Sequence, residues 1–245
     1  MSIYAAASGH VSDEVLVNLR KAGTATAWAF LQQKGVRTPF MMGIQPLGEV
    51  STMVGRARTL RYLPLREDLL PCVQDHRAVN PQRVAIESIE PGDVFVIDAG
   101  GRMDGAVLGD ILTTRVKRRG AAGMVVDGVV RDSPFIKKIG MPVYTRGGLG
   151  HPAASLSRHL PWEHSGPVQC GGVTVLPGDA ILGDEEGVLV IPAAYAADLA
   201  EWSIEHEHLE TFLRQKIESG ATIDEAYPPN EQVLAEYEAW KQSAR

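Results

Sequence analysis

The sequence predicts a single α/β domain, residues 1–245, with helical segments at both ends. An apolar strand, a helix and a second apolar strand follow one another between residues 94 and 126, and short apolar runs separated by glycine or proline follow between 141 and 191. Apolar residues then recur every three or four positions from 193 to 218, as in an amphipathic helix. With 44% hydrophobic residues in 245, the chain can bury one sizeable core, and nothing in it requires a second domain.

The first 35 residues are expected to form an N-terminal helical part. One helix is predicted over 13–21, ended by Gly23, and another over 24–34, ended by Gly35. Glycine commonly follows the last turn of a helix, because it adopts the left-handed conformation at little cost. The two helices are expected to pack as a pair.

Between residues 40 and 88 the pattern changes. Short apolar runs at 51–54 and 57–60 alternate with glycines and prolines, which indicates short strands and turns. A helix is expected within 75–88, and Pro81 either limits it or starts it.

The clearest segment follows the turn Pro91-Gly92-Asp93. A nearly continuous apolar strand is predicted over Val94–Asp98, a helix over Ala106–Arg119, and a second buried strand over Gly123–Val126. A strand, a helix and a strand in this order form a right-handed parallel crossover.

The second half of the chain predicts a mainly β layer and then a long helix. The amphipathic helix is expected over 193–218, and residues 193–245 together form a C-terminal helix and a peripheral tail. The short strands of the β layer are expected at 141–144, 168–170, 173–176, 180–182 and 188–191.

Composition and charge exclude several classes of protein. A formal net charge of −6 argues against a nucleic-acid or anionic-membrane surface, because both need a concentrated positive field. The two cysteines, Cys72 and Cys170, lack CxxC spacing and are expected to be free, mostly buried thiols. The N-terminus lacks the pattern of a signal peptide and no apolar run could span a bilayer, so we expect a cytoplasmic protein.

Candidate site residues follow both strands of the crossover. The stretch Gly109–Leu112 (Gly109, Asp110, Ile111, Leu112) opens the helix, where unpaired N–H groups and the helix dipole attract a carboxylate or phosphate. Arg131 and Asp132 follow the second strand and place a cation beside a hard oxygen ligand for a divalent metal. Ligands bind at such sheet edges in open α/β folds, so together these residues are expected to hold a small 2-oxo acid.

Each motif also has a purely structural interpretation. Asp110 can serve only as the helix N-cap, and Arg131 with Asp132 can form a local turn with an ion pair. In the functional interpretation Arg131 offers paired N–H donors to a carboxylate or enolate oxygen, Asp132 binds the cation, and Asp110 also holds metal-bound water. One carboxylate makes a weak metal site alone, so water and substrate must supply the other ligands.

Other motifs are assigned structural roles. The basic run 115–119 lies at a helix end, where cations complement the dipole. His206 and His208 are two positions apart and do not share a helix face, and residues 184–187 form a polar hairpin turn. No nucleotide fingerprint or nucleophile elbow is present, which leaves metal-assisted enolate chemistry as the best enzymatic fit.

Residues 109–132, GDILTTRVKRRGAAGMVVDGVVRD, resemble the RraA-like family. That family contains regulator-of-ribonuclease-activity-A-like proteins and 4-hydroxy-4-methyl-2-oxoglutarate/4-carboxy-4-hydroxy-2-oxoadipate aldolases. The resemblance extends to PGDVFVID at 91–98, GGVTVLPGD at 171–179 and DEEGV at 184–188, and covers roughly residues 13–220.

The resemblance implies a swivelling β/β/α domain assembled as homotrimers or homohexamers, with active sites between neighbouring subunits. By resemblance to the aldolases, residues 109–112 bind the pyruvyl carboxylate, Arg131 binds the oxo group and enolate, and Asp132 ligates magnesium. A glutamate on the C-terminal helix of the adjacent subunit holds metal-bound water. Glu207 is the candidate, with Glu205 and Glu210 as alternatives.

The expected function is therefore that of a class II pyruvate aldolase, dependent on magnesium or manganese, that also decarboxylates oxaloacetate. The alternative is a non-catalytic regulator of a ribonuclease, because some members bind ribonuclease E. Those members resemble proteins that have lost the aspartate after the arginine, whereas Asp132 is present here. Arg37, His76 and His151 are candidates for contacts with the distal end of the substrate.

Overall fold

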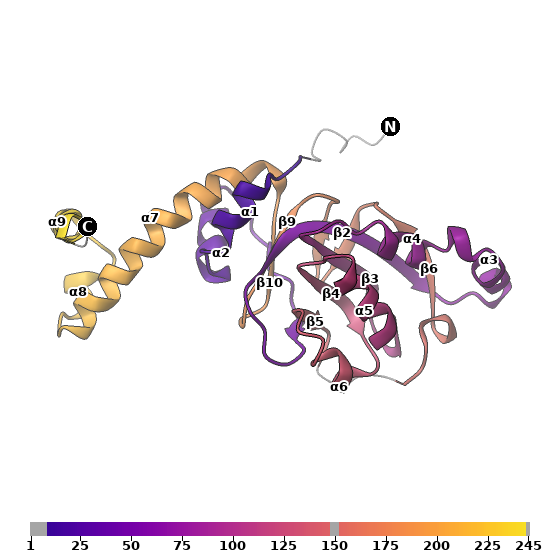
Figure 1. The fold of residues 1–245 in the computed structure, drawn as a ribbon. Helices are drawn as coiled ribbons and strands as arrows, with labels where there is room; N and C mark the ends of the chain where they lie inside the picture. The colour runs from indigo at the N-terminus through magenta and orange to yellow at the C-terminus, as the bar shows by residue number, and fades with distance from the viewer. Residues whose placement is uncertain (1–8, 148–151, 244–245) are drawn as a thin grey trace.

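The computed structural model describes residues 9–147 and 152–243, and its centre is one strongly curved sheet (Figure 1). Within these residues the strand order is β1-β5-β4-β3-β2-β9-β10. The long strand β2 pairs with β9 through its first half and with β6 through its second half. Strands β7 and β8 form a separate hairpin. The bounds are β1 (Gln45–Pro46), β2 (Met53–Pro64), β3 (Asp93–Ala106), β4 (Gly123–Val129), β5 (Val143–Thr145), β6 (His159–His164), β7 (Val168–Cys170), β8 (Val173–Val175), β9 (Ala180–Gly183) and β10 (Val188–Ile191).

Strands β2, β3, β4 and β5 are parallel neighbours, which confirms the predicted crossover from β3 to β4. The pairing of β3 with β4 is regular up to Asp98 and Asp127 and then shifts register twice before Ala106. The long, irregular second half of β3 thus carries the chain beyond the sheet edge to the start of the next helix.

The helices lie around this sheet and at one end of it. Their bounds are α1 (Asp13–Leu19), α2 (Thr24–Gln33), α3 (Leu70–Asp75), α4 (Pro81–Glu87), α5 (Asp110–Arg118), α6 (Ser133–Ile136), α7 (Ala193–Glu218), α8 (Ile223–Ala226) and α9 (Glu231–Ser243). Short 3-10 helices cover Glu67–Leu69 (η2), Arg77–Val79 (η3) and Ser155–Ser157 (η4).

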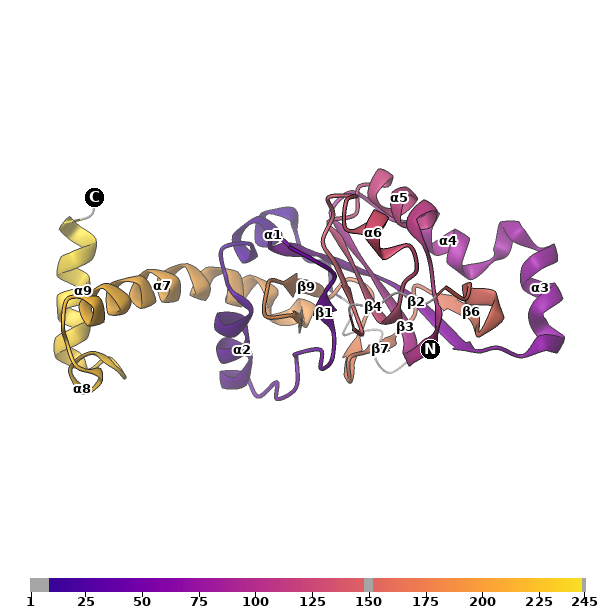
Figure 2. The same cartoon turned by 90° about the horizontal axis from the view of Figure 1, so that it is seen from below.

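Helices α4, α5 and α6 cover one face of the parallel strands (Figures 1 and 2). Ile86, Val116 and Ile136 of these helices belong to one buried cluster with Phe95 and Met124 of the sheet. Helix α4 begins at Pro81 because the Asn80 side chain accepts hydrogen bonds from the first N–H groups of the helix. This layer fixes where α5 begins relative to the end of β4.

The opposite face of the sheet packs against the β7–β8 hairpin. Val96 and Val125 point into a second buried cluster together with Val168 and Cys170 of the hairpin. Helices α1, α2 and the first half of α7 form a third cluster against β9 and β10. Both predicted N-terminal helices are therefore confirmed, but each packs mainly on α7 rather than on the other.

Helix α7 extends away from the body and ends in a small helical arm (Figure 2). Phe212 and Leu213 of α7 pack there against Val233 and Tyr237 of α9. No described helix is long and apolar enough to cross a membrane.

Several local predictions were wrong. The helix after β3 begins at Asp110 rather than at 106, because Val107 and Leu108 continue the chain from β3 in buried, non-helical backbone. The two short strands expected between 51 and 60 are one strand, β2, and β9 and β10 join the main sheet instead of forming a separate layer. Cys72 is exposed, whereas Cys170 is buried as expected.

Candidate active site

The candidate site lies where the start of α5 meets the end of β4. Two backbone hydrogen bonds link these segments: the N–H of Val107 donates to the carbonyl of Val129, and the N–H of Arg131 donates to the carbonyl of Leu108, each at 3.0 Å. Residues far apart in sequence are thereby held at the same sheet edge, as predicted. Gly109 occupies the N-cap position of α5.

A small pocket of about 80 Å³ opens at this junction. Its walls contain all four residues of the predicted anion-binding stretch, together with Arg131 and the start of η4. The lining residues are Ala106, Val107, Leu108, Gly109, Asp110, Ile111, Leu112, Arg131, Ala154 and Ser155.

Gly109 allows the two side chains after β4 to lie against the helix terminus. A Cβ atom at residue 109 would stand 2.4 Å from Oδ2 of Asp132 and 2.9 Å from Nε of Arg131. These two side chains form an ion pair with 3.4 Å between Arg131 Nε and Asp132 Oδ2, and both are partly exposed. The Arg131 guanidinium, the Asp132 carboxylate and the N-terminus of α5 therefore lie close together.

Asp132 has a backbone conformation that few non-glycine residues adopt. Its φ of 58° and ψ of 31° lie in the left-handed region, which costs free energy and is often found at functional sites. Asp132 stands at the N-cap position of α6, yet its side chain makes no capping hydrogen bond there. The carboxylate is thus turned toward Arg131 rather than used to start the helix.

The expected capping role of Asp110 was wrong. Gly109 is the N-cap, and Asp110 is the first residue of α5. Oδ1 of Asp110 accepts a hydrogen bond of 2.7 Å from the N–H of Ile111. One amide of the four-residue stretch is therefore directed to this carboxylate, and Asp110 itself lines the pocket.

Buried polar side chains hold the segment before Gly109 from behind. The carbonyl of Val107 accepts from Nε2 of Gln82 at 2.9 Å and from the hydroxyl of Tyr62 at 3.3 Å. Nε2 of His159 lies 2.8 Å from the carbonyl of Gly105. These three residues were not predicted, because nothing in their local sequence patterns indicates a contact with residues 105–107.

Burial determines how two of these groups ionise. Burial raises the pKa of the Tyr62 hydroxyl well above its usual range, so it stays a neutral donor. Burial lowers the pKa of His159, although the carbonyl of Gly105 opposes that shift. A neutral imidazole with its proton on Nε2 satisfies that carbonyl.

The structure does not bring Glu207 into this pocket within one chain. Its Oε1 accepts from the Thr26 hydroxyl at 2.7 Å and from the Gly23 N–H at 3.5 Å, at the start of α2. Of the two alternatives, Glu205 binds Lys241 and Glu210 pairs with Arg214 and His206. Helix α7 and the start of α5 lie in separate parts of the molecule (Figure 2).

The three candidates for distal contacts are not gathered at the pocket. Arg37 and His76 are exposed, and Nδ1 of His76 lies 3.2 Å from the carbonyl of Cys72. His151 lies outside the described residues. None of the three lines the candidate pocket in the described part of the chain.

The Asp132 carboxylate, which pairs with Arg131 beside the pocket, suits a hard, partly hydrated cation. The carboxylate of Asp132 is 40% exposed and makes no helix-capping bond. Across the described ranges there is no group of three or more His, Cys, Asp or Glu side chains that could hold a metal. Magnesium commonly keeps several waters and uses one or two carboxylates, whereas structural zinc needs about four protein ligands.

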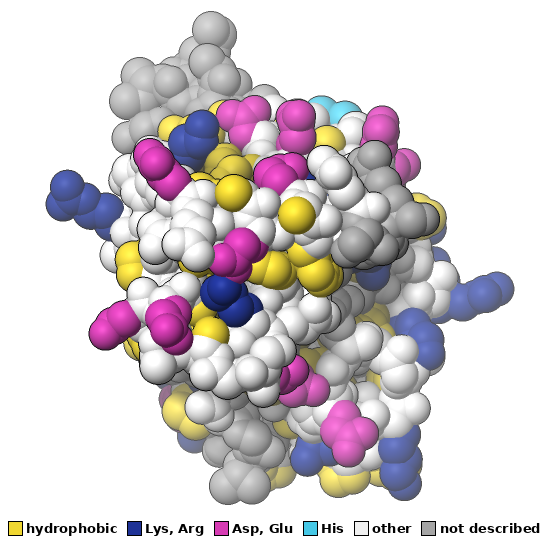
Figure 3. All heavy atoms as spheres, turned by 90° about the vertical axis from the view of Figure 1, so that its left-hand side faces the viewer, with side chains coloured by type: hydrophobic (Ala, Val, Ile, Leu, Met, Phe, Trp, Pro, Cys, Tyr) yellow, Lys and Arg dark blue, Asp and Glu magenta, His cyan; other side chains and the backbone are white. Residues whose placement is uncertain are grey.

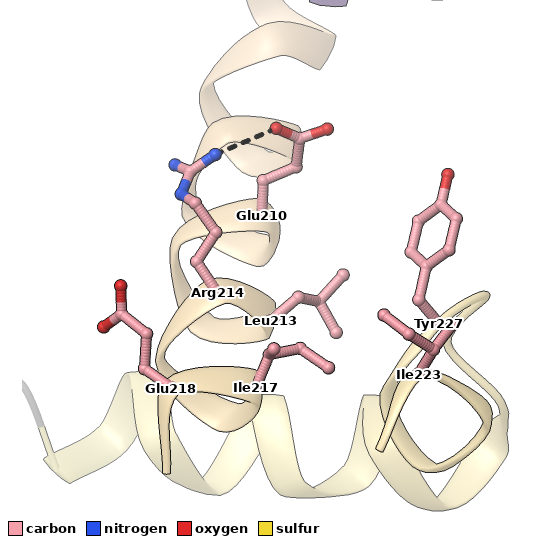
Figure 4. Close-up of a pocket in the computed structure, with 7 residues that line it drawn as sticks. All are labelled: Glu210, Leu213, Arg214, Ile217, Glu218, Ile223 and Tyr227. Carbon is pink, nitrogen blue, oxygen red and sulfur yellow. Dashed lines mark hydrogen bonds and ion pairs between the residues drawn. The ribbon is translucent and has the colours of Figure 1, made fainter. Parts of the chain in front are cut away.

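A larger pocket lies on the arm, between α7 and α8 (Figure 4). Leu213 and Ile217 point across it toward Ile223 and Tyr227. A pocket with such apolar walls would bind a hydrophobic group rather than an anionic substrate. It is therefore not the candidate active site. The face seen from the arm side carries acidic side chains among hydrophobic ones, with basic side chains scattered between them (Figure 3).

The chain belongs to the RraA-like family. The family model described as Aldolase/RraA matches residues 9–190, which include the pocket and all of the sheet except the last residue of β10. The fold class inferred from the resemblance is therefore confirmed.

Individual relatives carry different names. RraAS2 of Streptomyces coelicolor, described as an unusual member of the RNase ES inhibitor RraA protein family, is 35% identical and superposes with a TM-score of 0.76 over 84% of this chain and 98% of that one. A relative from Halalkalibacterium halodurans, provisionally named a 4-hydroxy-4-methyl-2-oxoglutarate aldolase, is 39% identical over 61% of this chain and 64% of its own. Protein DlpA of Legionella pneumophila is 32% identical over 76% of this chain, which spans only 29% of DlpA.

Proposed function

We propose that this chain is a divalent-metal-dependent pyruvate aldolase that cleaves 4-hydroxy-2-oxo acids, of the 4-hydroxy-4-methyl-2-oxoglutarate type, and also decarboxylates oxaloacetate. The observation that carries the proposal is the contact of Gly109 with the side chains of Arg131 and Asp132. Arg131 lines the small pocket at this helix N-terminus, and the Asp132 carboxylate pairs with Arg131 beside it, which supports a site for an anionic substrate and a hard cation. The aldolase name of the Halalkalibacterium halodurans relative supports the same reaction class.

In this proposal the N–H groups at the start of α5 bind the substrate carboxylate. Arg131 binds the oxo group and stabilises the negative charge that develops on it as the carbon–carbon bond breaks. Asp132 holds magnesium or manganese. When bound, that ion would supply Lewis-acid polarisation of the 2-oxo group.

Proton removal is assigned to a water that carboxylates of two subunits hold in place. Asp110, together with Glu207 of a neighbouring subunit, orients the water that removes the proton from the C4 hydroxyl. The proposal therefore requires a homotrimer or homohexamer in which α7 of one copy reaches the pocket of another. Glu205 and Glu210 lie on the same helix and are the alternatives for this role.

The test is the rate of pyruvate release from 4-hydroxy-4-methyl-2-oxoglutarate and from oxaloacetate, with magnesium or with a chelator, for the native chain and Asp132→Ala. We expect metal-dependent release that the variant loses while its thermal unfolding stays close to native. Asp104→Ala removes an exposed carboxylate outside the pocket and is the matched control. Unchanged metal-dependent release by Asp132→Ala would refute the assignment.

A second candidate function rests on the similarity to RraAS2. Its description in an RNase ES inhibitor family favours a regulator that binds a ribonuclease without turnover. This candidate predicts no pyruvate release at any metal concentration and a measurable complex with an RNase E-type enzyme.

A further inference from the structure

Ser155 has the only hydroxyl side chain among the residues that line the candidate pocket. The other two polar side chains of the lining already have partners. Asp110 accepts from the N–H of Ile111, and Arg131 pairs with Asp132. Across the described part of the chain the Ser155 hydroxyl makes no hydrogen bond, so it is available to a ligand.

A second serine in the same turn has its hydroxyl engaged. Oγ of Ser157 donates to the carbonyl of Ala154 at 2.6 Å, within the 3-10 helix η4. Ser157 is exposed and does not line the pocket, whereas Ser155 is half-buried and does. The two serines therefore differ in the property that matters for binding, and Ser157 is a matched control for Ser155.

The turn that carries Ser155 is fixed to the end of β3 on both sides. Before it, the carbonyl of Ala153 accepts from the N–H of Ala106 at 3.0 Å. After it, Nε2 of His159 lies 2.8 Å from the carbonyl of Gly105. A hydroxyl held in this way loses little conformational freedom when it binds a ligand, which favours affinity.

The N-terminus of α5 does not offer all of its first amides to a carboxylate. The N–H of Ile111 donates to Oδ1 of Asp110, and the N–H of Thr113 donates to the carbonyl of Gly109. Within the described residues, the N–H groups of Asp110 and Leu112 are left without an acceptor. A carboxylate has about four lone-pair sites on its two oxygens, so it can accept a further hydrogen bond beside these two amides.

We propose that Ser155 is a substrate-binding residue, whose hydroxyl donates a hydrogen bond to the carboxylate of the 2-oxo acid beside the free amides of α5. The inference rests on the proposed function for what occupies the pocket. It adds a donor from outside the β3–α5–β4 crossover. Because the pocket measures only about 80 Å³, it suits the pyruvyl part of a substrate, and Ser155 therefore contacts the part that all the proposed substrates share.

The first test is calorimetric titration of the full chain with pyruvate in the presence of magnesium. Ser155→Ala should weaken pyruvate binding about tenfold, as expected for the loss of one hydrogen bond to a charged group. Ser155→Thr keeps a hydroxyl and should restore most of the affinity. Ser157→Ala removes a hydroxyl from the same turn outside the pocket and should bind pyruvate like the native chain.

Steady-state kinetics provides a second readout that a purely structural role would not move in the same way. Ser155→Ala should raise KM by the same factor for 4-hydroxy-4-methyl-2-oxoglutarate and for oxaloacetate, with a much smaller change in kcat. The reason is that a hydrogen bond to the shared carboxylate is present both in the bound substrate and in the transition state.

Several outcomes would overturn this inference. They are native pyruvate affinity in Ser155→Ala, an equal loss in Ser157→Ala, no recovery in Ser155→Thr, no binding of pyruvate by the native chain, or a KM change confined to one of the two substrates. The titration needs no turnover, so the expected loss of pyruvate binding without any pyruvate release refutes only the proposed cleavage. Pyruvate release with native KM in Ser155→Ala refutes only the role of Ser155.

Discussion

Gly109 and Asp132 can occupy their positions together only because residue 109 has no side chain. A Cβ atom there would lie 2.4 Å from Oδ2 of Asp132, well inside contact distance. The backbone of Gly109, with φ at −124° and ψ at −166°, is extended and accessible to any residue. Glycine is therefore required at this position by the close approach of the Asp132 and Arg131 side chains and not by the backbone conformation.

Gly109→Ala is expected to lower pyruvate release by about 100-fold or more, because it displaces the side chains of Arg131 and Asp132 from the helix terminus. Thermal unfolding should change much less, since the backbone conformation suits alanine. Gly166→Ala, outside the pocket, is the control, because a Cβ there would meet only the carboxylate end of the exposed Glu163 side chain. Native rates in Gly109→Ala would show that this contact is not part of the active site.

Gln82→Leu is expected to raise KM for 2-oxo acids several-fold and to lower the free energy of unfolding by about 1 kcal/mol. The substitution removes the Nε2 donor that holds the Val107 carbonyl two residues before Gly109. Tyr62→Phe removes the second, longer hydrogen bond to the same carbonyl and should have a smaller effect. Steady-state kinetics and urea unfolding measure both quantities. A loss of stability with KM unchanged would make Gln82 a structural residue only.

Two inactive variants are expected to complement each other. Asp132→Ala and Glu207→Gln should each be inactive alone, because the proposed site takes one residue from each of two copies. After unfolding and refolding as an equal mixture, about a quarter of the sites should combine a native Asp132 with a native Glu207. Pyruvate release from the mixture measures this recovery.

If the mixture recovers no activity, the other two glutamates of α7 are tested next. Glu205→Gln and Glu210→Gln are tested in the same way, because both residues lie on α7. Recovery with one of these would transfer the role of Glu207 to that residue. Recovery with none of the three would contradict an active site shared between copies through α7.

The stability of the chain is expected to fall as the pH drops below the ordinary histidine value of about 6.5, in part through His159. Burial lowers the pKa of this residue, and the charge of Arg102 acts in the same direction, while the Gly105 carbonyl and Asp104 oppose it. The folded state therefore binds fewer protons at His159 than the unfolded state does. The stabilisation that this residue contributes is present above its unfolded pKa and is lost as the pH falls.

Urea unfolding between about pH 7.5 and 5.5 measures this dependence. His159→Gln retains an N–H donor for the Gly105 carbonyl but does not titrate, so its stability should vary less with pH. His76→Gln, which removes an exposed histidine, should behave like the native chain. An identical pH dependence in His159→Gln would exclude His159 as a source of the effect.

The sequence by itself determined the elements whose signals are local. The amphipathic repeat predicted α7 over Ala193–Glu218 with the bounds that the structure has. The apolar runs predicted β4 and the parallel crossover, and the order of strand and helix placed residues 109–112 near Arg131 and Asp132. Such elements can be predicted from sequence because hydrophobic periodicity and turn residues determine secondary structure over a few neighbouring positions.

Only the tertiary structure decided what depends on residues far apart in the chain. It made Gly109 the N-cap in place of Asp110, added β9 and β10 to the main sheet, and set Gln82 behind Val107. These contacts arise from the packing of α4 and α5 on the sheet, which no local pattern of side chains specifies.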